Sequence, residues 1–403
     1  MKYSKDEVIQ YIHEEDVKFI RLSFCDVFGR QKNISIMPQE LDRAFSYGIA
    51  FDASAIAGFG DESRSDLLLH PDPETLSTLP WRPEHGRVVR MYTSISYPDA
   101  RPFECDTRSL LKKAILDAKS MGYSFSFGAE MEFYLFRLDD SGEPTKLPYD
   151  NAGYMDIAPD DRGENIRREI CLTLEQMGIQ PESSHHEEGP GQNEIDFRYS
   201  DALTAADNAM TFQTVVKTVA RRNGLFADFT PKPLEDKPGN GFHINVSVRS
   251  EDGSDKLPHV IAGMLDKICD MTAFLNPTEN SYARLGRNKA PAYVSWSSEN
   301  RSQLIRIPAA TGEYRRAELR SPDPTANPYL AFALIIYAGL YGIKKQLEPP
   351  TSENLNLYKT TLEQLSKYKR LPQNLGAACV LASQSEFVRE HIPPSVLDIY
   401  LGR

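Results

Sequence analysis

The sequence predicts an α+β fold divided into two domains, and three observations lead to this prediction. The chain has 403 residues, which exceeds the length of one typical domain. Predicted helices alternate with predicted strands beyond residue 102. Many of these strands show a clean two-residue period, which favours an antiparallel or mixed sheet with one face toward a cavity over a doubly wound sheet buried on both faces.

The first predicted domain covers residues 1–102. A polar helix is expected over residues 5–15. Residues 17–38 alternate apolar and polar positions around a Phe-Gly turn, which predicts a β-hairpin. Residues 63–102 are rich in Pro, Asp and Arg, so we expect loops and short strands there, with the domain boundary close to residue 102.

The second predicted domain covers residues 103–403 and begins with a helix capped by Asp106 and terminated by Gly122. Further helices are predicted over 163–178, 204–224 and 331–343, and strands over 123–136, 191–200, 241–248 and 316–320. The apolar run 331–343 is shorter than the roughly 20 residues of a membrane span and indicates a buried helix.

Composition argues against several classes of function. The net charge is -11, which argues against a nucleic acid partner. The five cysteines form no CxxC pair, which is typical of a reducing compartment and argues against a thiolate zinc site. The first ten residues contain no apolar signal core, so we predict a cytoplasmic protein without a membrane partner.

Acidic side chains recur on predicted strand faces. In FGAEMEFYLF the apolar residues share one face, while Glu130 and Glu132 share the other. In SSHHEEGPGQNEIDFRYS, Glu187 and Glu194 flank a Gly-Pro-Gly turn. The adjacent His185 and His186 point to opposite faces of an extended chain, and we interpret both as structural. A solvated strand face would explain each carboxylate pair alone; the alternative is a divalent cation site.

Two later motifs favour the cation site. GNGFHINVSV places His243 at the start of a strand behind a glycine turn, and RRAELR alternates Arg316, Glu318 and Arg320 on one face. Glutamates with a single imidazole suit Mg²⁺ or Mn²⁺ better than zinc, and neighbouring arginines suit phosphoryl transfer. The residues alone therefore indicate a Mg²⁺-dependent, ATP-using enzyme or a phosphatase.

Taken in order, these segments resemble the glutamine synthetase family, of the bacterial type I sort. The matching stretches are AFDASAI, GAEMEFYLF, SHHEEGPGQNEIDFRY, PKPLEDKPGNGFHINVS, NSYARL, APAYVSWSSENRSQLIRIP and AELRSPDPTANPYLA. The resemblance implies an N-terminal β-grasp domain and a C-terminal catalytic domain whose curved antiparallel sheet is flanked by helices. It also implies that ATP phosphorylates the γ-carboxylate of L-glutamate and that ammonia then displaces phosphate.

The resemblance assigns a role to each matching position. Two metal ions, Mg²⁺ or Mn²⁺, would be held by Glu132, Glu187 and Glu194 and by Glu130, His243 and Glu318. Glutamate would contact Gly239, Arg284 and Arg320, and phosphate would be stabilised by Arg301, Arg306 and Arg316. The nucleotide would lie against Glu182, Tyr199, Asn245 and Ser247. Tyr154 would line the ammonium pocket, and Asp52 would reach the site of a neighbouring subunit and help to deprotonate ammonium.

Three positions depart from the family pattern. Lys289, in GRNKAP, stands where the family has the flap glutamate that closes the ammonium pocket; Ala55 replaces a serine and Pro238 an asparagine. A lysine there opposes a bound NH₄⁺, since two unit charges ~4 Å apart interact by ~4 kcal/mol at an effective dielectric of 20. Three interpretations follow: Lys289 points to solvent, which we favour; it pairs with a carboxylate on an organic amine; or it serves as a base.

The leading hypothesis is a glutamate–ammonia ligase. The alternatives are a γ-glutamyl-amide ligase that uses an organic amine, and a non-catalytic relative that binds nucleotide or amino acid. The role of Asp52 requires a homo-oligomer, expected as a ring of six. The chain stops at Arg403, before the helix with which the family usually continues, so stacking into twelve subunits stays open.

Overall fold

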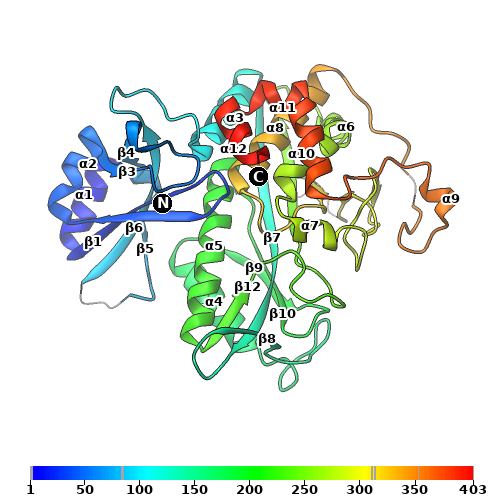
Figure 1. The fold of residues 1–403 in the computed structure, drawn as a ribbon, viewed down its shortest axis with the longest axis horizontal. Helices are drawn as coiled ribbons and strands as arrows, with labels where there is room; N and C mark the ends of the chain where they lie inside the picture. Colours follow the sequence, from blue (N-terminus) through cyan, green and yellow to red (C-terminus); the bar gives the residue numbers. More distant parts are fainter. Residues whose placement is uncertain (1–2, 83–85, 310–311, 313–314, 353, 403) are drawn as a thin grey trace.

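The computed structural model describes residues 3–82, 86–309, 312, 315–352 and 354–402. The N-terminal part forms a lobe around its own sheet, shown in blue and cyan in Figure 1, beside a larger lobe formed by the rest of the chain. In the larger lobe the long strand β7 runs through the centre, with helices α3 and α8 near its upper part.

The N-terminal sheet has six strands in the order β2-β1-β6-β4-β3, with β5 paired to β6. The strands are β1 (Val17–Cys25), β2 (Gln31–Ile36), β3 (Ile49–Asp52), β4 (Asp66–Pro71), β5 (Ser77–Thr78) and β6 (Arg87–Ser96). The strands β1 and β2 form the predicted hairpin, while β1 and β6 run parallel. Helices α1 (Lys5–Glu14) and α2 (Leu41–Tyr47) belong to this lobe, and Ser4 caps α1 through a capping box.

The second sheet has ten strands, ordered β14-β15-β16-β13-β7-β10-β9, with β8, β11 and β12 also paired to β7. Its strands are β7 (Tyr123–Leu138), β8 (Pro144–Pro148), β9 (Pro181–His186), β10 (Gln192–Phe197), β11 (Ser200–Asp201), β12 (Leu225–Asp228), β13 (Phe242–Ser250), β14 (Trp296–Ser298), β15 (Ile305–Ile307) and β16 (Ala317–Leu319). All pairs are antiparallel except β14 with β15.

The helices of the larger lobe are α3 (Thr107–Ser120), α4 (Glu164–Gln176), α5 (Ala202–Arg222), α6 (Leu257–Leu275), α7 (Glu279–Arg284), α8 (Pro328–Lys344), α9 (Leu362–Leu365), α10 (Leu375–Gln384), α11 (Glu386–His391) and α12 (Pro394–Leu401). Of these, α3, α5 and α8 pack on the apolar side of this sheet, whereas α9 lies away from it. The helices α6 and α8 approach so closely that a Cβ atom on Gly263 would lie 2.0 Å from the Ala338 carbonyl oxygen. Glycine at this crossing lets two buried helices form one core.

The two faces of β7 differ as the sequence predicts. Phe127, Ala129, Met131, Phe133 and Leu135 are at most 1% exposed and pack on the helix side, where the Phe127 ring stacks on Phe332 at 4.3 Å. The intervening polar residues face the opposite side of the sheet. Burial of one face against helices thus leaves the other face free to line a cavity.

Most elements predicted from the sequence are confirmed, including the helix begun by Asp106, whose carboxylate accepts from the Arg108 backbone N–H. The predicted α+β class, with a curved and mainly antiparallel sheet, is also confirmed. The domain boundary near residue 102 stays a prediction. Among the described helices, none has the length and apolar character needed to cross a lipid bilayer.

Asn327 joins the two lobes, and we expect its replacement by alanine to cost about 2 kcal/mol of unfolding free energy. Its Oδ1 caps α8 at the Tyr329 N–H, and its Nδ2 donates to the Val27 carbonyl at 3.0 Å from a fully buried position. Asn327→Ala would remove the cap and leave that carbonyl unpaired. Denaturant unfolding would measure the loss, with Asn374→Ala, at the α10 cap, as a control expected to lose less; equal losses would contradict the inter-lobe role.

Candidate active site

Strand register gathers the polar residues into one row across the concave side of the large sheet. On β7, Glu130 lies opposite Asp196 of β10 on one side and His243 of β13 on the other. Glu318 of β16 lies opposite Asn245 of β13, two residues beyond His243 on the same face. Residues distant in sequence therefore meet because each occupies the alternate, non-core position of its strand.

The first cluster consists of Glu130, His243 and Glu318. The Nδ1 atom of His243 lies 3.4 Å from Glu130 Oε2 and 3.6 Å from Glu318 Oε1. Burial alone would raise the pKa of Glu130, but the hydrogen bond and charge of His243, with the hydrogen bond from Asn245, lower it to about 2. One ligand atom from each of the three residues falls within 4.8 Å of the others, close enough to share a cation.

The second cluster differs from the predicted set of Glu132, Glu187 and Glu194. Ligand atoms of Glu187 and Glu194 approach one another together with those of His185, for which the sequence predicts a structural role. Glu132 lies opposite Glu194 in the same cavity, but its Oε2 accepts from the Gly241 N–H at 2.7 Å. The three glutamates are thus neighbours, with Glu132 turned toward the backbone of the glycine loop.

Electrostatic repulsion marks this second cluster. Burial, followed by the charges of Asp196, Glu132, Glu130 and Glu187, raises the pKa of Glu194 well above its ordinary value. Burial and the charge of Glu132 likewise raise the pKa of Glu187. Buried carboxylates that share no cation raise one another's pKa in this way, and a bound divalent cation would reverse the effect.

Asp196 is a site residue that the sequence reading missed. It lies two positions after Glu194 on β10, and its carboxylate falls in a third cluster with Glu130 and Glu194. Burial and the charge of Glu130 raise its pKa to about 6. The sequence does contain a pattern that predicts this position, because the two-residue period of QNEIDF places Gln192, Glu194 and Asp196 on one face of the strand.

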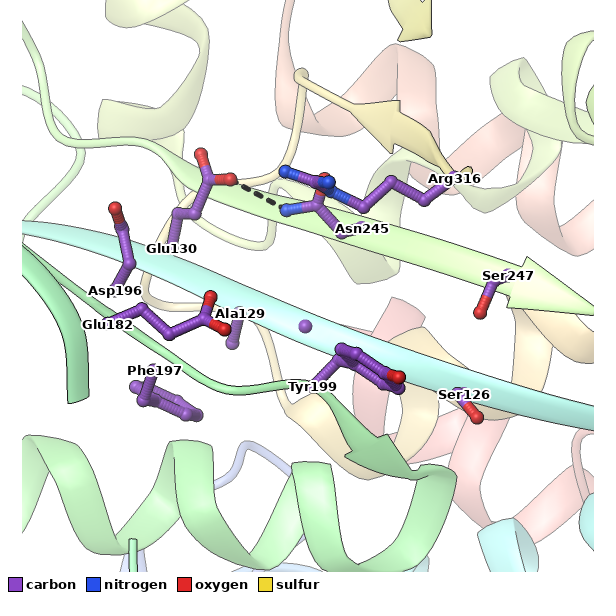
Figure 2. Close-up of a pocket in the computed structure, with 11 residues that line it drawn as sticks. Ser126, Ala129, Glu130, Glu182, Asp196, Phe197, Tyr199, Asn245, Ser247 and Arg316 are labelled. Carbon is purple, nitrogen blue, oxygen red and sulfur yellow. Dashed lines mark hydrogen bonds between the residues drawn. The ribbon is translucent and has the colours of Figure 1, made fainter. Parts of the chain in front are cut away.

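The four predicted nucleotide residues line one pocket, of about 110 Å³, shown in Figure 2. Glu182, Tyr199, Asn245 and Ser247 all belong to its wall. Ser126 and Gly128 of β7 also line this pocket. In the sheet they lie opposite Ser247 and Asn245 of β13. In Figure 2 the Tyr199 and Phe197 rings lie on one side of the strands and Asn245 and Arg316 on the other.

A larger cavity of about 490 Å³ adjoins this pocket and shares Glu130, Asp196 and Arg316 with it. The predicted residues that line it are Glu130, Glu132, Tyr154, Glu187, Glu194, Gly239, His243, Arg284, Lys289, Arg301, Arg306, Arg316 and Arg320. Glu318 is fully buried behind it, where Arg306 Nε and Arg320 Nη1 donate to its two oxygens, the latter at 3.1 Å. The carboxylate thereby orients both arginines.

Arg284 and the glycine loop form one wall of this cavity. Arg284 is 3% exposed and donates to the Ser321 carbonyl at 2.7 Å. Burial lowers its pKa, while the nearby carboxylates of Glu132 and Asp323 oppose that shift. A Cβ atom on Gly239 would lie 2.3 Å from the Pro231 carbonyl oxygen, so only glycine lets the loop pass beside Arg284.

Lys289 lies at the mouth of the larger cavity, with a half-exposed side chain that is also paired with an acid. Its ammonium group pairs with the Glu188 carboxylate and lies 5.5 Å from the centre of the Tyr154 ring. The side chain is 52% exposed, and all three residues line the cavity. The charge of Lys289 is therefore neutralised by Glu188, which the sequence analysis does not predict as a site residue.

The predictions for His186 and Asp52 have different outcomes. His186 is fully buried; its Nε2 lies 2.9 Å from Asp150 Oδ1 and its Nδ1 2.7 Å from the Glu187 carbonyl, which fits the structural role predicted. Asp52 is exposed and accepts from the Ser54 N–H and hydroxyl. It is not among the described residues that line the two cavities, and its role at a neighbouring subunit stays a prediction.

Comparison with known proteins gives one consistent result. Residues 16–98 match the family model of the glutamine synthetase β-grasp domain, and residues 104–402 match that of the glutamine synthetase catalytic domain. The chain is 43% identical to a glutamine synthetase of Clostridium saccharobutylicum, covering 100% of this chain and 94% of the relative. It is 44% identical to one of Methanosarcina mazei, covering 99% and 92%.

Solved structures agree with these sequence matches. The complex of GmaS with ADP superimposes with a TM-score of 0.88 at 29% identity, covering 98% of this chain and 94% of that one. GmaS without ligand gives a TM-score of 0.88 at 30% identity, covering 98% and 93%. The chain belongs to the glutamine synthetase family and is an ATP-dependent ligase.

Proposed function

We propose that the protein is a glutamate–ammonia ligase that acts through a γ-glutamyl phosphate. The observation that carries this proposal is the junction of two cavities at Glu130, Asp196 and Arg316. One cavity has the predicted nucleotide residues and the other the predicted glutamate residues. Their junction is where a phosphoryl group would pass from ATP to the γ-carboxylate, which turns a poor leaving group into phosphate.

The donor sets suit divalent cations of the magnesium or manganese type. We infer that Glu130, His243 and Glu318 hold one ion, and that Glu132, Glu187 and Glu194 hold the second. Both sets offer carboxylate oxygens with at most one imidazole, and burial together with neighbouring carboxylates raises the pKa of Glu187 and of Glu194. Bound ions would neutralise charge on the phosphate groups of the nucleotide.

The arginines supply the complementary charge on the glutamate side. Arg284 and Arg320 are each 3% exposed and line the larger cavity, and Arg320 Nε has no hydrogen-bond partner among the described residues. A buried guanidinium N–H without an acceptor supports a role in binding a substrate carboxylate. Arg301, Arg306 and Arg316 line the same space and would stabilise the phosphate that leaves.

The Lys289–Glu188 pair supports ammonium as the nucleophile. A paired Lys289 adds no net charge at the cavity mouth, so the expected repulsion of NH₄⁺ is offset by Glu188. An amine with its own carboxylate would have to displace Glu188 from the lysine. We therefore propose that Glu188 neutralises Lys289 at the cavity mouth, and that Asp52 of a neighbouring subunit of the homo-oligomeric ring assists in handling ammonium.

The alternative is a γ-glutamyl-amide ligase that uses a small organic amine. It is favoured by the likeness to GmaS, a γ-glutamylmethylamide synthetase, and by the absence of a carboxylate on the flap loop itself, residues 286–291. Glu187 and Tyr154 line the mouth in either case. The two functions differ only in the nucleophile and not in the activation of glutamate.

Phosphate release from ATP with Mg²⁺ and glutamate separates the alternatives. The assay would compare ammonium with methylamine, ethylamine and glycine, each with product identification by mass spectrometry. The proposal expects ammonium to give the highest kcat/KM. A higher kcat/KM for any amine would refute ammonium as the preferred nucleophile, and failure to turn over with every nucleophile would refute the ligase proposal.

Glu188→Gln is expected to raise the KM for ammonium roughly tenfold, which corresponds to about 1.4 kcal/mol. The variant leaves Lys289 without its counter-charge at the mouth, which opposes a cationic substrate. The KM for ATP should not change, because Glu188 does not line the nucleotide pocket. The double variant Glu188→Lys/Lys289→Glu restores the pair with reversed direction and should recover most of the affinity; an unchanged KM in Glu188→Gln would contradict the assignment.

A further inference from the structure

Two large aromatic side chains occupy the polar face of β7, on which the catalytic acids lie. Tyr134 and Phe136 follow Glu130 and Glu132 at two-residue intervals, and their rings stack at 5.6 Å. Tyr134 is fully buried and is not among the described residues that line the two catalytic cavities. Its hydroxyl can therefore affect the reaction only through the protein segments that it holds.

The Tyr134 hydroxyl lies where two segments of the catalytic cavity meet. It donates to the Pro238 carbonyl at 2.7 Å, at the start of the glycine loop, residues 238–241. It also packs against Gly189 in the acidic turn, residues 187–191, because a Cβ atom on this glycine would lie 2.0 Å from the hydroxyl oxygen. One buried hydroxyl thus contacts both segments at once.

Gln192 joins the same two segments. It is the direct partner of Tyr134 across the two strands and is 1% exposed. Its Oε1 accepts from the Gly189 N–H at 3.0 Å, while its Nε2 donates to the Gly239 carbonyl at 3.1 Å and to Glu132 Oε2 at 3.3 Å. The opposite amide orientation would place Oε1 against two acceptor oxygens, so the surroundings fix the orientation seen here.

The far end of the glycine loop is anchored independently of these two side chains. Asn240 is fully buried, and its Nδ2 donates to the carbonyls of Asp228 and Thr230 at 3.0 and 2.9 Å. The near end of the loop is held by the tyrosine hydroxyl and the glutamine amide. Loss of either donor would therefore release the near end of the loop without unfolding the rest.

We propose that Tyr134 and Gln192 are positioning residues for L-glutamate, which together hold the glycine loop against the acidic turn. The inference rests on the proposed function, in which Gly239 contacts glutamate while Glu187 and Glu188 lie at the cavity mouth. A released loop would bind glutamate less tightly, because binding would then have to order the loop. The described lining of the nucleotide pocket contains no residue of either segment, so nucleotide binding should be unaffected.

Steady-state kinetics of conservative variants test the positioning role. Tyr134→Phe, which removes one hydroxyl, should raise the KM for L-glutamate about fivefold, and Gln192→Met should raise it about tenfold, the scale of one or two lost hydrogen bonds. The KM for ATP should not change in either variant. A wild-type KM for glutamate in both variants, or an equal rise in the two KM values, would overturn the proposal.

Tyr337→Phe is the matched control for the loss of a buried hydroxyl. Tyr337 is 6% exposed, its hydroxyl donates to Asp117 at 2.7 Å, and it lies outside the described lining of both catalytic cavities. The control should keep the wild-type KM for glutamate. A rise equal to that in Tyr134→Phe would overturn the proposal, because it would show an effect of stability alone.

Hydrogen–deuterium exchange of the full chain tests the same contact without turnover. In the wild type, L-glutamate with Mg²⁺ should slow exchange in peptides that cover the glycine loop and the acidic turn. In Tyr134→Phe and Gln192→Met the acidic turn should exchange faster and no longer respond to glutamate. A response of the turn in both variants as strong as in the wild type, or no response in the wild type, would overturn the proposal. Absence of wild-type turnover with every nucleophile would instead refute the ligase function, and the exchange result would still decide the positioning role.

Discussion

Replacing Glu194 with glutamine is expected to lower turnover by at least about 100-fold and to raise the melting temperature of the metal-free protein. The two effects have one origin. Glu194 is 8% exposed and lies among four other acids, which is favourable only when cations are bound. Gln keeps the shape of the side chain but removes one charge and one cation ligand.

The sign of the stability effect follows from the direction of the pKa shift. The folded-state pKa of Glu194 is raised, so the folded protein binds the proton more tightly than the unfolded chain does. The wild type therefore loses stability as pH rises above the ordinary glutamate pKa, and Glu194→Gln does not incur this loss. The advantage of the variant should vanish near pH 4 and grow toward pH 8.

Melting curves in EDTA and in Mg²⁺ measure this prediction. The variant should melt at least about 1 °C above the wild type in EDTA at pH 8, the shift that about 1 kcal/mol produces in a chain of 403 residues. Mg²⁺ should raise the melting temperature of the wild type more than that of the variant. Glu169→Gln, on the exposed side of α4, is the matched control and should change neither quantity. A variant less stable than the wild type in EDTA would contradict the repulsive cluster.

The sequence was sufficient for the parts of the site that depend on strand period. Alternation alone predicts that Glu130 and Glu132 share one face of β7 and that Glu318 of β16 shares a face with the flanking Arg316 and Arg320; all but the buried Glu318 line the larger cavity. The family resemblance added residues in loops, such as Gly239, whose position no periodicity could predict. Strand alternation and the family resemblance both place residues whose positions depend on the course of the backbone.

The parts that the sequence did not predict depend on side-chain pairing between distant segments. Lys289 and Glu188 are 101 residues apart, and only the folded chain brings them together. Local sequence patterns predict which face of a strand a residue occupies, but they do not predict which residue lies opposite it on the neighbouring strand.

Replacing Glu318 with glutamine should also lower turnover, but with the opposite effect on stability. Glu318 is fully buried; Arg306 Nε and Arg320 Nη1 donate to its oxygens, and His243 Nδ1 lies 3.6 Å away. Glu194 lies among acidic side chains, whereas Glu318 lies among arginine and histidine side chains. Its loss leaves buried guanidinium groups without a counter-charge, which costs about 3–5 kcal/mol when one partner of a buried ion pair is removed.

Glu318→Gln should therefore lower the melting temperature in EDTA and reduce turnover at least about 100-fold. Asp207→Asn provides the matched control, since Asp207 forms a buried bidentate pair with Arg108 and lies outside the described lining of both catalytic cavities. That control should be destabilised to a similar extent yet keep its activity per folded molecule. Loss of turnover in both variants would show that stability alone limits the enzyme. A Glu318→Gln protein as stable as the wild type would show that the arginines find other partners, in which case they are not held for substrate by this carboxylate.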